Sequence, residues 1–227
     1  MALVLYQHPL ASFCHKVLIA LYENGTPFEP RLIECAAADE HARFLDLWPV
    51  GKMPVLRDEA RDATVPETSI IIEYLDRHYP GPLPLLPADP AANLDARLWD
   101  RFFDLYVSVP MQKIVLDRLR GEGEHDPRGV ADAHASLGIA YGMLEHRMSG
   151  RLWAAGDSFG LADCSAAPAL FYAGIVTPFG EGFPNLSAYF ERLLQRPSYA
   201  RVLAEARPYF KLFPYYERMP ARFLAED

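Results

Sequence analysis

Cysteine is scarce in this sequence, and the few cysteines are not arranged to pair or to hold a metal. Cys14, Cys35 and Cys164 are the three cysteines among 227 residues, an odd number set far apart without a CxxC pair or metal-ligand spacing. Disulfide frameworks and structural zinc sites use closely spaced, usually even-numbered cysteines. The pattern predicts reduced thiols in a reducing compartment, and we expect no bound metal.

Excess positive charge and long hydrophobic runs are also missing. The formal net charge is −8, from 30 acidic and 22 basic side chains. A negative field repels polyanions, so neither nucleic acid nor an acidic membrane surface is an expected partner. The longest mainly apolar run, 166–176, is about half of a membrane span, and no basic region of a signal peptide precedes the first apolar residues. We predict a cytoplasmic protein.

Proline, by contrast, is abundant and unevenly placed. Twenty residues are proline, well above the average of about 5%. Five of them fall between positions 80 and 90. Because proline breaks helices and favours extended chain, this stretch predicts a linker between two compact units. The expected organisation is a first domain at 1–80, a linker at 81–93, a second domain at 94–207 and a tail at 208–227.

Strand-like and helix-like segments alternate in the first eighty residues, which is typical of a small α/β domain. Apolar runs and helical spacing predict strands at 3–6, 28–33, 55–56 and 64–65, and helices at 14–22, 40–47 and 69–78.

Only helical patterns follow the linker. Apolar residues at three- and four-residue spacing predict a long helix at 91–119 and further helices at 130–148, 161–172, 186–194 and 199–206. The tail holds three prolines and six aromatic residues. A segment so rich in aromatics would aggregate if it were exposed, so we expect it to pack on the body of the protein.

Four motifs, in this order and at these intervals, resemble those of cytosolic glutathione transferases of the bacterial, serine type. They are the segments 6–17 (YQHPLASFCHKV), 51–56 (GKMPVL), 67–75 (ETSIIIEYL) and 156–163 (GDSFGLAD), with the last followed by Pro184-Asn-Leu and Arg196-Pro-Ser-Tyr. The likeness runs over nearly the whole chain. It implies α/β + all-α architecture: a thioredoxin-like N-terminal domain followed by an all-helical C-terminal domain. No GxGxxG or P-loop string supports a nucleotide-binding alternative.

The second and third motifs correspond to the family's glutathione-binding segments. The resemblance implies that Pro54 follows a cis peptide bond and that Met53 offers its backbone to the cysteinyl part of glutathione. It also implies that the Thr68 hydroxyl and a nearby amide hold the γ-glutamyl carboxylate. Glu67 then faces the γ-glutamyl ammonium, although the alternative for the Glu67-Thr68 pair is helix capping.

Two residues are candidates for the glycyl carboxylate of glutathione. Lys52 is the first of them, and His41 is the second. An exposed lysine without a ligand is the alternative for Lys52.

The residue that activates the thiol is not settled by the motif. A thiol with a pKa of about 8.5 is mostly protonated at pH 7, so the enzyme needs a donor near the sulfur. The position that carries the activating serine in the family holds Ala11 here, and Ser12 follows it. Ser12 is therefore the catalytic candidate, with an ordinary helix N-cap as its alternative. Cys14 or Tyr6 could serve instead, or no side chain activates the thiol.

In the helical half, Asp163 matches the acid of the family's helix-capping motif, and Gly160 stands where a hydroxyl residue usually begins it. We expect Asp163 to be structural. The acceptor pocket should lie between the domains, with Phe102, Tyr106 and Met111 as candidate lining residues. The aromatic tail is expected to fold over that pocket.

These features predict a transferase that conjugates glutathione, its co-substrate, to small hydrophobic electrophiles in detoxification. Alternatives are a glutathione-dependent isomerase or dehalogenase, and a non-enzymatic glutathione- or ligand-binding protein of the same fold. The resemblance also implies a homodimer.

Overall fold

The computed structural model describes residues 3–34 and 38–225. Cys35 lies outside the described residues. Cys14 and Cys164 are both buried, free thiols.

The N-terminal half is built on a sheet of four strands. They are β1 (Leu3–Gln7), β2 (Glu29–Leu32), β3 (Val55–Asp58) and β4 (Ala63–Pro66), in the order β2-β1-β3-β4. β1 and β2 pair in parallel, whereas β3 pairs antiparallel with both β1 and β4. The parallel pair needs a crossover, which α1 (Ser12–Glu23) supplies. This is the small α/β domain that the alternating pattern predicts, in the thioredoxin-like arrangement that the resemblance implies.

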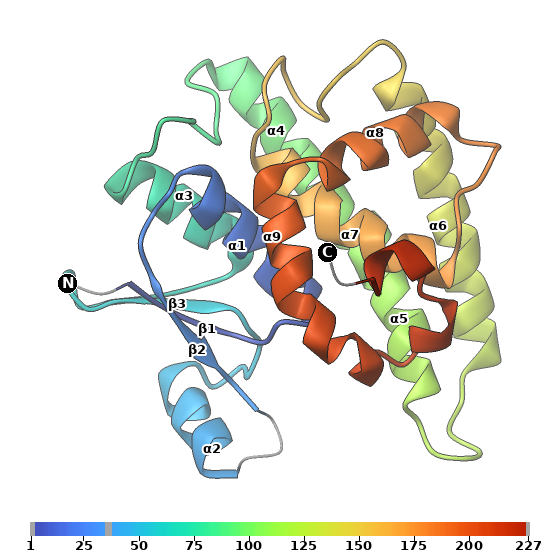
Figure 1. The fold of residues 1–227 in the computed structure, drawn as a ribbon, viewed down its shortest axis with the longest axis horizontal. Helices are drawn as coiled ribbons and strands as arrows, with labels where there is room; N and C mark the ends of the chain where they lie inside the picture. The colour runs from blue at the N-terminus through green and yellow to red at the C-terminus, as the bar shows by residue number, and fades with distance from the viewer. Residues whose placement is uncertain (1–2, 35–37, 226–227) are drawn as a thin grey trace.

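Helices cover both faces of the sheet. Side chains alternate between the faces along each strand, and both faces carry apolar side chains that pack against a helix. Leu5 and Leu56 pack with α1 and with α3 (Thr68–His78), while Val55 packs on the other face against Phe44 of α2 (Ala38–Leu47). Figure 1 shows α2 on the opposite side of the sheet from α1 and α3.

The second half is helical, as predicted. Its helices are α4 (Pro90–Phe102), α5 (Val109–Arg118), α6 (Pro127–Met148), α7 (Leu161–Val176), α8 (Pro184–Leu194) and α9 (Pro197–Ala206). Between α4 and α5 runs a π-helical segment, η1 (Phe103–Ser108), so the long helix expected at 91–119 is a composite. Several helices start earlier than predicted because proline occupies their first turn, a position that needs no amide hydrogen.

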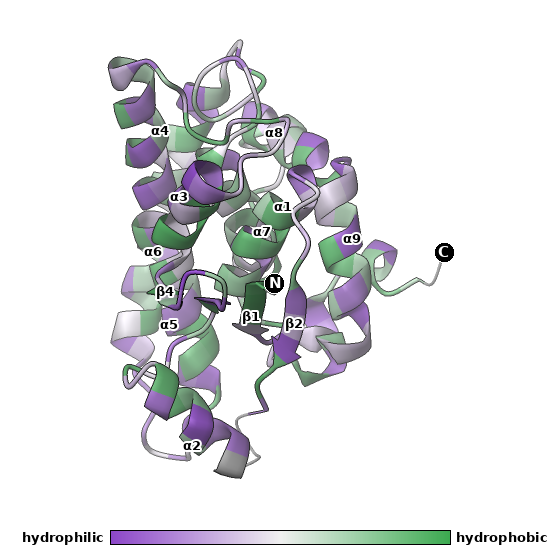
Figure 2. Cartoon of the chain, turned by 90° about the vertical axis from the view of Figure 1, so that its left-hand side faces the viewer, coloured by the Kyte–Doolittle hydropathy of each residue, from purple (hydrophilic) through white to green (hydrophobic). Residues whose placement is uncertain are grey.

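Helix α7 forms the centre of the molecule. Of its residues, Gly174 alone is not buried. α7 packs against α1 of the first half and against α4 and η1 of the second. Its mainly apolar sequence has no polar face, which is typical of a helix surrounded on all sides (Figure 2). The sheet domain and the helical domain therefore share one hydrophobic core.

The C-terminal tail packs on α7, as predicted. It forms the 3-10 segments Arg207–Leu212, Tyr216–Arg218 and Ala221–Phe223. The ring of Phe210 stacks on Phe171 at 5.8 Å between centroids, and Phe213 meets Tyr172 at 5.1 Å. Phe210 and Phe213 are buried. The tail is thus part of the folded body.

Candidate active site

The five predicted binding residues line one cavity, which we call the polar pocket. Its volume is about 220 Å³, and its walls are Phe13, Lys52, Met53, Pro54, Glu67, Thr68, Arg101, Asp104, Leu105 and Val109. Residues 52–54 and 67–68 come from the loop before β3 and from the start of α3. Helix α4 and the π segment form the opposite wall. The loop before β3, the start of α3 and the α4–η1 region thus meet at one site.

The loop before β3 has the geometry implied by the resemblance. The Met53–Pro54 peptide bond is cis. Pro54 is buried and Met53 is half-buried. Within the described part of the chain, neither the amide nor the carbonyl of Met53 makes a backbone hydrogen bond. Both groups are therefore free to pair with an extended peptide, as a strand edge does.

The start of α3 presents backbone donors to the same pocket. Thr68 is the first residue of α3 and is buried, and Glu67 is the N-cap residue. Glu67 has φ 67° and ψ 118°, in a region that residues other than glycine rarely adopt. Its side chain makes no capping hydrogen bond. Helix capping therefore does not explain Glu67, and the first amides of α3 stay available for an anion.

Behind the polar pocket lies a buried ionic group, which we call the Lys16 cluster. Lys16 Nζ lies 2.6 Å from Asp100 Oδ1, 2.9 Å from Asp104 Oδ2 and 2.9 Å from Ser69 Oγ. The Lys16 side chain is 1% exposed. Ser165 of α7 donates to Asp100 as well. The cluster joins α1, α3, α4, η1 and α7, because each contributes one of its members.

The two carboxylates of the cluster differ. Burial acts to raise the pKa of Asp100, but the charge and hydrogen bond of Lys16, together with hydrogen bonds from Ser165 and Ser69, outweigh it and hold that pKa below its ordinary value. Burial raises the pKa of Asp104 despite Lys16, and neighbouring Asp100 adds to the effect. Arg101 donates to both carboxylates and lines the polar pocket with its half-exposed side chain.

Sequence reasoning missed this cluster. The available signal was a lysine inside the apolar pattern of the first helix and two aspartates four residues apart on an otherwise apolar stripe. Charged residues are almost never fully buried unless they are paired. The π-helical segment that carries Asp104 has no comparable signal in the sequence.

A second cavity, the apolar pocket, adjoins the start of α1. Its volume is about 320 Å³, and its walls are Leu10, Ala11, Ser12, Met111, Gln112, Val115, Leu116, Leu119, Tyr172, Phe213 and Pro214. Tail residues Phe213 and Pro214 form part of it, as does Met111, one of the expected lining residues. Phe102 instead packs among other rings of the core, and Tyr106 is largely exposed.

Ser12 lines the apolar pocket, and it is Phe13 that faces the polar one. Ser12 is the first residue of α1 and is 8% exposed, while Ala11 is the N-cap residue. The N-cap interpretation of Ser12 is therefore wrong. The Ser12 hydroxyl makes no hydrogen bond to another described residue, which leaves it available to a ligand.

The other candidates line neither pocket. Cys14 is fully buried, and burial raises the pKa of its thiol to about 12, so the thiol stays protonated. Tyr6 lies on β1, where its hydroxyl accepts a hydrogen bond from Arg31 and its ring meets Phe44 of α2. His41 belongs to α2.

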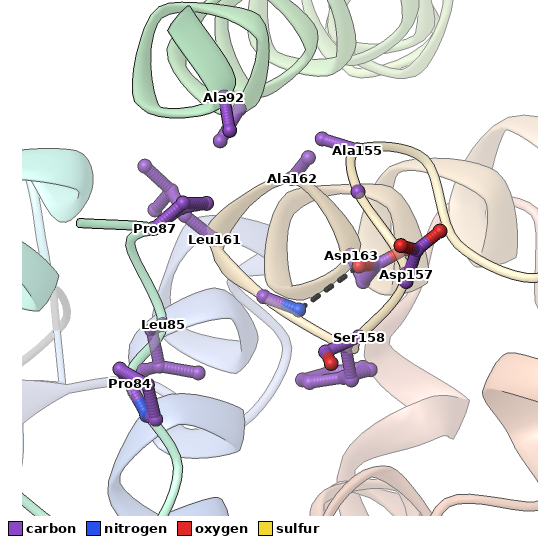
Figure 3. A pocket seen from close by; sticks show the side chains of 14 residues that line it. Pro84, Leu85, Pro87, Ala92, Ala155, Asp157, Ser158, Leu161, Ala162 and Asp163 are labelled. Carbon is purple, nitrogen blue, oxygen red and sulfur yellow. Dashed lines mark hydrogen bonds between the residues drawn. The ribbon is translucent and has the colours of Figure 1, made fainter. Parts of the chain in front are cut away.

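A third, larger cavity is lined by none of the predicted glutathione-binding residues. It has a volume of about 350 Å³ and lies between the linker, α4 and the start of α7 (Figure 3). There Asp163 accepts from the backbone amides of Ala154 and Gly160 and from the Tyr189 hydroxyl, which confirms its capping role. A β-carbon on Gly160 would lie 2.9 Å from the backbone oxygen of Leu85, so a hydroxyl residue there would require the backbone to shift.

Residues 3–34 and 38–225 include no helix whose length and hydrophobicity would let it span a membrane. Within the same residues, no three or more histidine, cysteine, aspartate or glutamate side chains lie together in a group that could hold a metal ion.

Comparisons with known proteins agree with this architecture. Models of the glutathione S-transferase N-terminal and C-terminal domains match residues 5–83 and 120–197. A glutathione S-transferase-like protein, LUC7, of Fusarium is 30% identical over 183 residues, covering 79% of this chain and 83% of that protein. A stringent starvation protein A homologue of Haemophilus influenzae is 29% identical over 202 residues, covering 86% and 87%.

Solved structures share the whole fold. A glutathione S-transferase from Methylobacterium radiotolerans, crystallised with glutathione sulfonate, superposes with a TM-score of 0.74 at 28% identity. The match covers 89% of this chain and 94% of that one. Both halves of the chain, in the order in which the structure joins them, thus match the same family. The protein belongs to the glutathione S-transferase family.

Proposed function

We propose that the protein is a glutathione transferase, with glutathione in the polar pocket and a small hydrophobic electrophile in the apolar pocket. The observation that carries this proposal is the convergence of five residues, predicted from separate motifs, on one polar cavity. Ser12, whose hydroxyl has no hydrogen-bond partner among the described residues, lines the apolar cavity. The related transferase crystallised with glutathione sulfonate gives independent support for glutathione as the ligand.

The polar pocket has complementary groups for each end of a zwitterionic tripeptide. The free backbone of Met53 pairs with the cysteinyl residue, held by the turn at Pro54. The Thr68 hydroxyl and the first amides of α3 bind the γ-glutamyl carboxylate, while Glu67 faces the ammonium. Lys52, which is exposed at the rim, meets the glycyl carboxylate.

Ser12 is proposed to activate the thiol. Its hydroxyl donates to the sulfur, and the N-terminus of α1 adds a positive partial charge, so both favour the thiolate over the thiol. The thiolate then attacks the electrophilic carbon of the acceptor. The new carbon–sulfur bond forms as the electron pair leaves with a departing group or moves into an adjacent π system.

The apolar pocket and the tail are proposed to select the acceptor. Its walls are mainly aliphatic and aromatic side chains, which favour small hydrophobic electrophiles. Glu217 of the tail forms an ion pair with Arg118 of α5 at 2.6 Å, and the Arg118 guanidinium lies over the Tyr215 ring. These contacts hold the tail against α5, whose residues line the pocket.

A homodimer is also proposed. Six large apolar side chains on α3, α4, η1 and the start of α5 are each at least 50% exposed: Ile70, Leu94, Leu98, Leu105, Tyr106 and Val109. Clustered exposure of this kind marks an interaction surface. Leu105 and Val109 also line the polar pocket, so a second copy on this face would border the glutathione site. A cytoplasmic role in detoxification completes the proposal.

A binding protein without turnover is the second candidate. It is favoured by the separation of Ser12 from the polar pocket and by a relative that bears a stringent starvation name. Isomerisation or dehalogenation would use the same thiolate on a different acceptor.

The experiment that tests the proposal has two stages. The purified protein is first measured for glutathione binding by calorimetry, and a panel of electrophiles is then assayed for conjugation. Binding with conjugation supports the transferase. Binding without conjugation favours the second candidate, and no binding at millimolar glutathione contradicts both.

A further inference from the structure

A buried histidine holds the loop that carries Ser12. His15, one helical turn after Ser12, is fully buried, and its Nε2 lies 2.5 Å from the carbonyl oxygen of Pro9. A carbonyl can only accept, so Nε2 carries the hydrogen and donates it. Pro9 belongs to the short connection between β1 and α1, residues 8–11, whose Leu10 and Ala11 line the apolar pocket beside Ser12.

The same connection is fixed at its other end by His8. The Leu10 amide donates to His8 Nδ1 at 3.1 Å, and the Ala11 amide donates to the His8 carbonyl at 2.9 Å. The His8 ring also meets the Tyr209 ring of the tail at 5.6 Å. The hydrogen bond of His15 to the Pro9 carbonyl ties the same connection to the buried core.

Packing alone does not account for a histidine at this position. The His15 ring contacts Tyr172 of α7 and Tyr199 of α9, at 5.7 and 6.4 Å between centroids. Its Nδ1 and both tyrosine hydroxyls are buried without a hydrogen-bond partner among the described residues. A buried polar atom without a partner costs free energy that an aliphatic side chain would avoid. Burial also lowers the pKa of His15 to about 4, so the imidazole is neutral near pH 7.

We infer that His15 is a positioning residue: its hydrogen bond to Pro9 sets the connection 8–11, and with it the place of the Ser12 hydroxyl relative to the sulfur of glutathione. The inference rests on the proposed function for its effect on catalysis. The effect on the loop itself does not depend on that function.

The test compares His15→Leu, which removes the donor, with His15→Gln, whose amide nitrogen can occupy the place of Nε2. Tyr199→Phe is the matched control, since it keeps the ring against His15 and removes a hydroxyl that has no hydrogen-bond partner among the described residues. Hydrogen exchange of the peptide covering residues 8–14 reports on the loop in the full chain. The pH profile of kcat/KM for the acceptor, measured at saturating glutathione, reports the pKa of the bound thiol.

We expect His15→Leu to speed exchange of this peptide and to lower kcat/KM at neutral pH by about tenfold, the worth of roughly one hydrogen bond. The thiol pKa rises, while KM for the acceptor stays within about twofold. His15→Gln restores both readouts, and Tyr199→Phe leaves both unchanged. If the leucine variant does not fold, His15→Asn, whose shorter amide cannot reach Pro9, replaces it.

Equal effects of the leucine and glutamine variants would overturn the inference in favour of a packing role. Unchanged exchange and an unchanged pH profile in both variants would overturn it as well. A wild-type protein that binds no glutathione would contradict the proposed function, yet the exchange experiment would still decide whether His15 holds the loop.

Discussion

Consecutive residues of α1, Ser12 and Phe13, line the apolar and the polar pocket, yet the two pockets are held in place by different physical means. The polar pocket rests on backbone groups, on the start of α3 and on the ionic Lys16 cluster behind them. The apolar pocket rests on side-chain packing between α1, α5, α7 and the tail. Substitutions in a site held by backbone groups and buried charges disturb the fold, whereas substitutions in a site lined by side chains change mainly the shape of that site. The first kind of site fits a co-substrate that stays the same, and the second fits acceptors that differ.

The largest expected effect comes from removing the buried cation. Lys16→Met leaves Asp100 and Asp104 facing each other without Lys16, and breaking a buried pair in this way costs about 3–5 kcal/mol of unfolding free energy. Denaturant unfolding measures the loss. Lys113→Met, which removes the surface partner of Asp126, is the control and should cost far less. Equal losses would show that the Lys16 cluster does not stabilise the site.

A more local change separates the two pockets. Thr68→Val keeps the shape of the side chain and removes the hydroxyl proposed to hold the γ-glutamyl carboxylate. A hydrogen bond to a charged group is worth about 1.5–3 kcal/mol, so glutathione affinity should fall roughly ten- to a hundredfold. Calorimetry measures the affinity, and KM for the acceptor should stay constant. Thr26→Val, outside both pockets, is the matched control, and a similar loss there would contradict the assignment.

The converse change is on the tail. Phe213→Ala removes one wall of the apolar pocket, so KM for hydrophobic acceptors should rise by roughly tenfold while glutathione affinity stays the same. Phe223→Ala is the control, because Phe223 packs on Phe171 away from this pocket. Steady-state kinetics with both substrates varied gives the two constants. An equal change in glutathione affinity would mean that the pockets are not independent.

A further expected effect is a pH dependence of stability in the helical half. Asp163 is buried, and burial raises its pKa from 3.8 to about 6, although its hydrogen bonds and the charge of Arg196 act to lower it. The folded state therefore binds the proton more tightly than the unfolded state, so ionisation favours unfolding. This stabilisation is complete below the unfolded pKa and is lost as pH rises through about 6.

Urea unfolding between pH 4 and 7 measures the effect. Asp163→Asn has no ionisable group at this position, so its free energy of unfolding should fall less steeply than that of the wild type as pH rises from 4 to 7. An identical slope in the wild type and in the variant would contradict the raised pKa.

The two pockets also differ in how far the sequence predicts them. The polar pocket could be anticipated because its predicted residues lie in two short motifs that resemble the glutathione-binding segments of the family. The strands and most helices followed from the same local patterns. The apolar pocket collects single side chains from α1, α5, α7 and the tail, so Met111 was found while Phe102 and Tyr106 were misplaced.

What the sequence could not show depends on tertiary contact. The pairing of Lys16 with Asp100 and Asp104 joins residues more than eighty positions apart, and the π-helical segment that carries Asp104 has no local signal. The position of Ser12 is a similar case. Its neighbour Phe13 faces the polar pocket because the helix begins at Ser12 and directs consecutive side chains to different sides.

The most direct test of the account is the ionisation of glutathione bound to the protein. The ultraviolet absorbance of the thiolate, titrated against pH, gives the thiol pKa in the complex for the wild type and for Ser12→Ala. The account predicts a pKa well below the free value of about 8.5 in the wild type, and a return toward that value in Ser12→Ala. A thiol pKa that is unshifted on binding, or equally lowered in both proteins, would contradict the assignment of Ser12 and the cooperation of the two pockets.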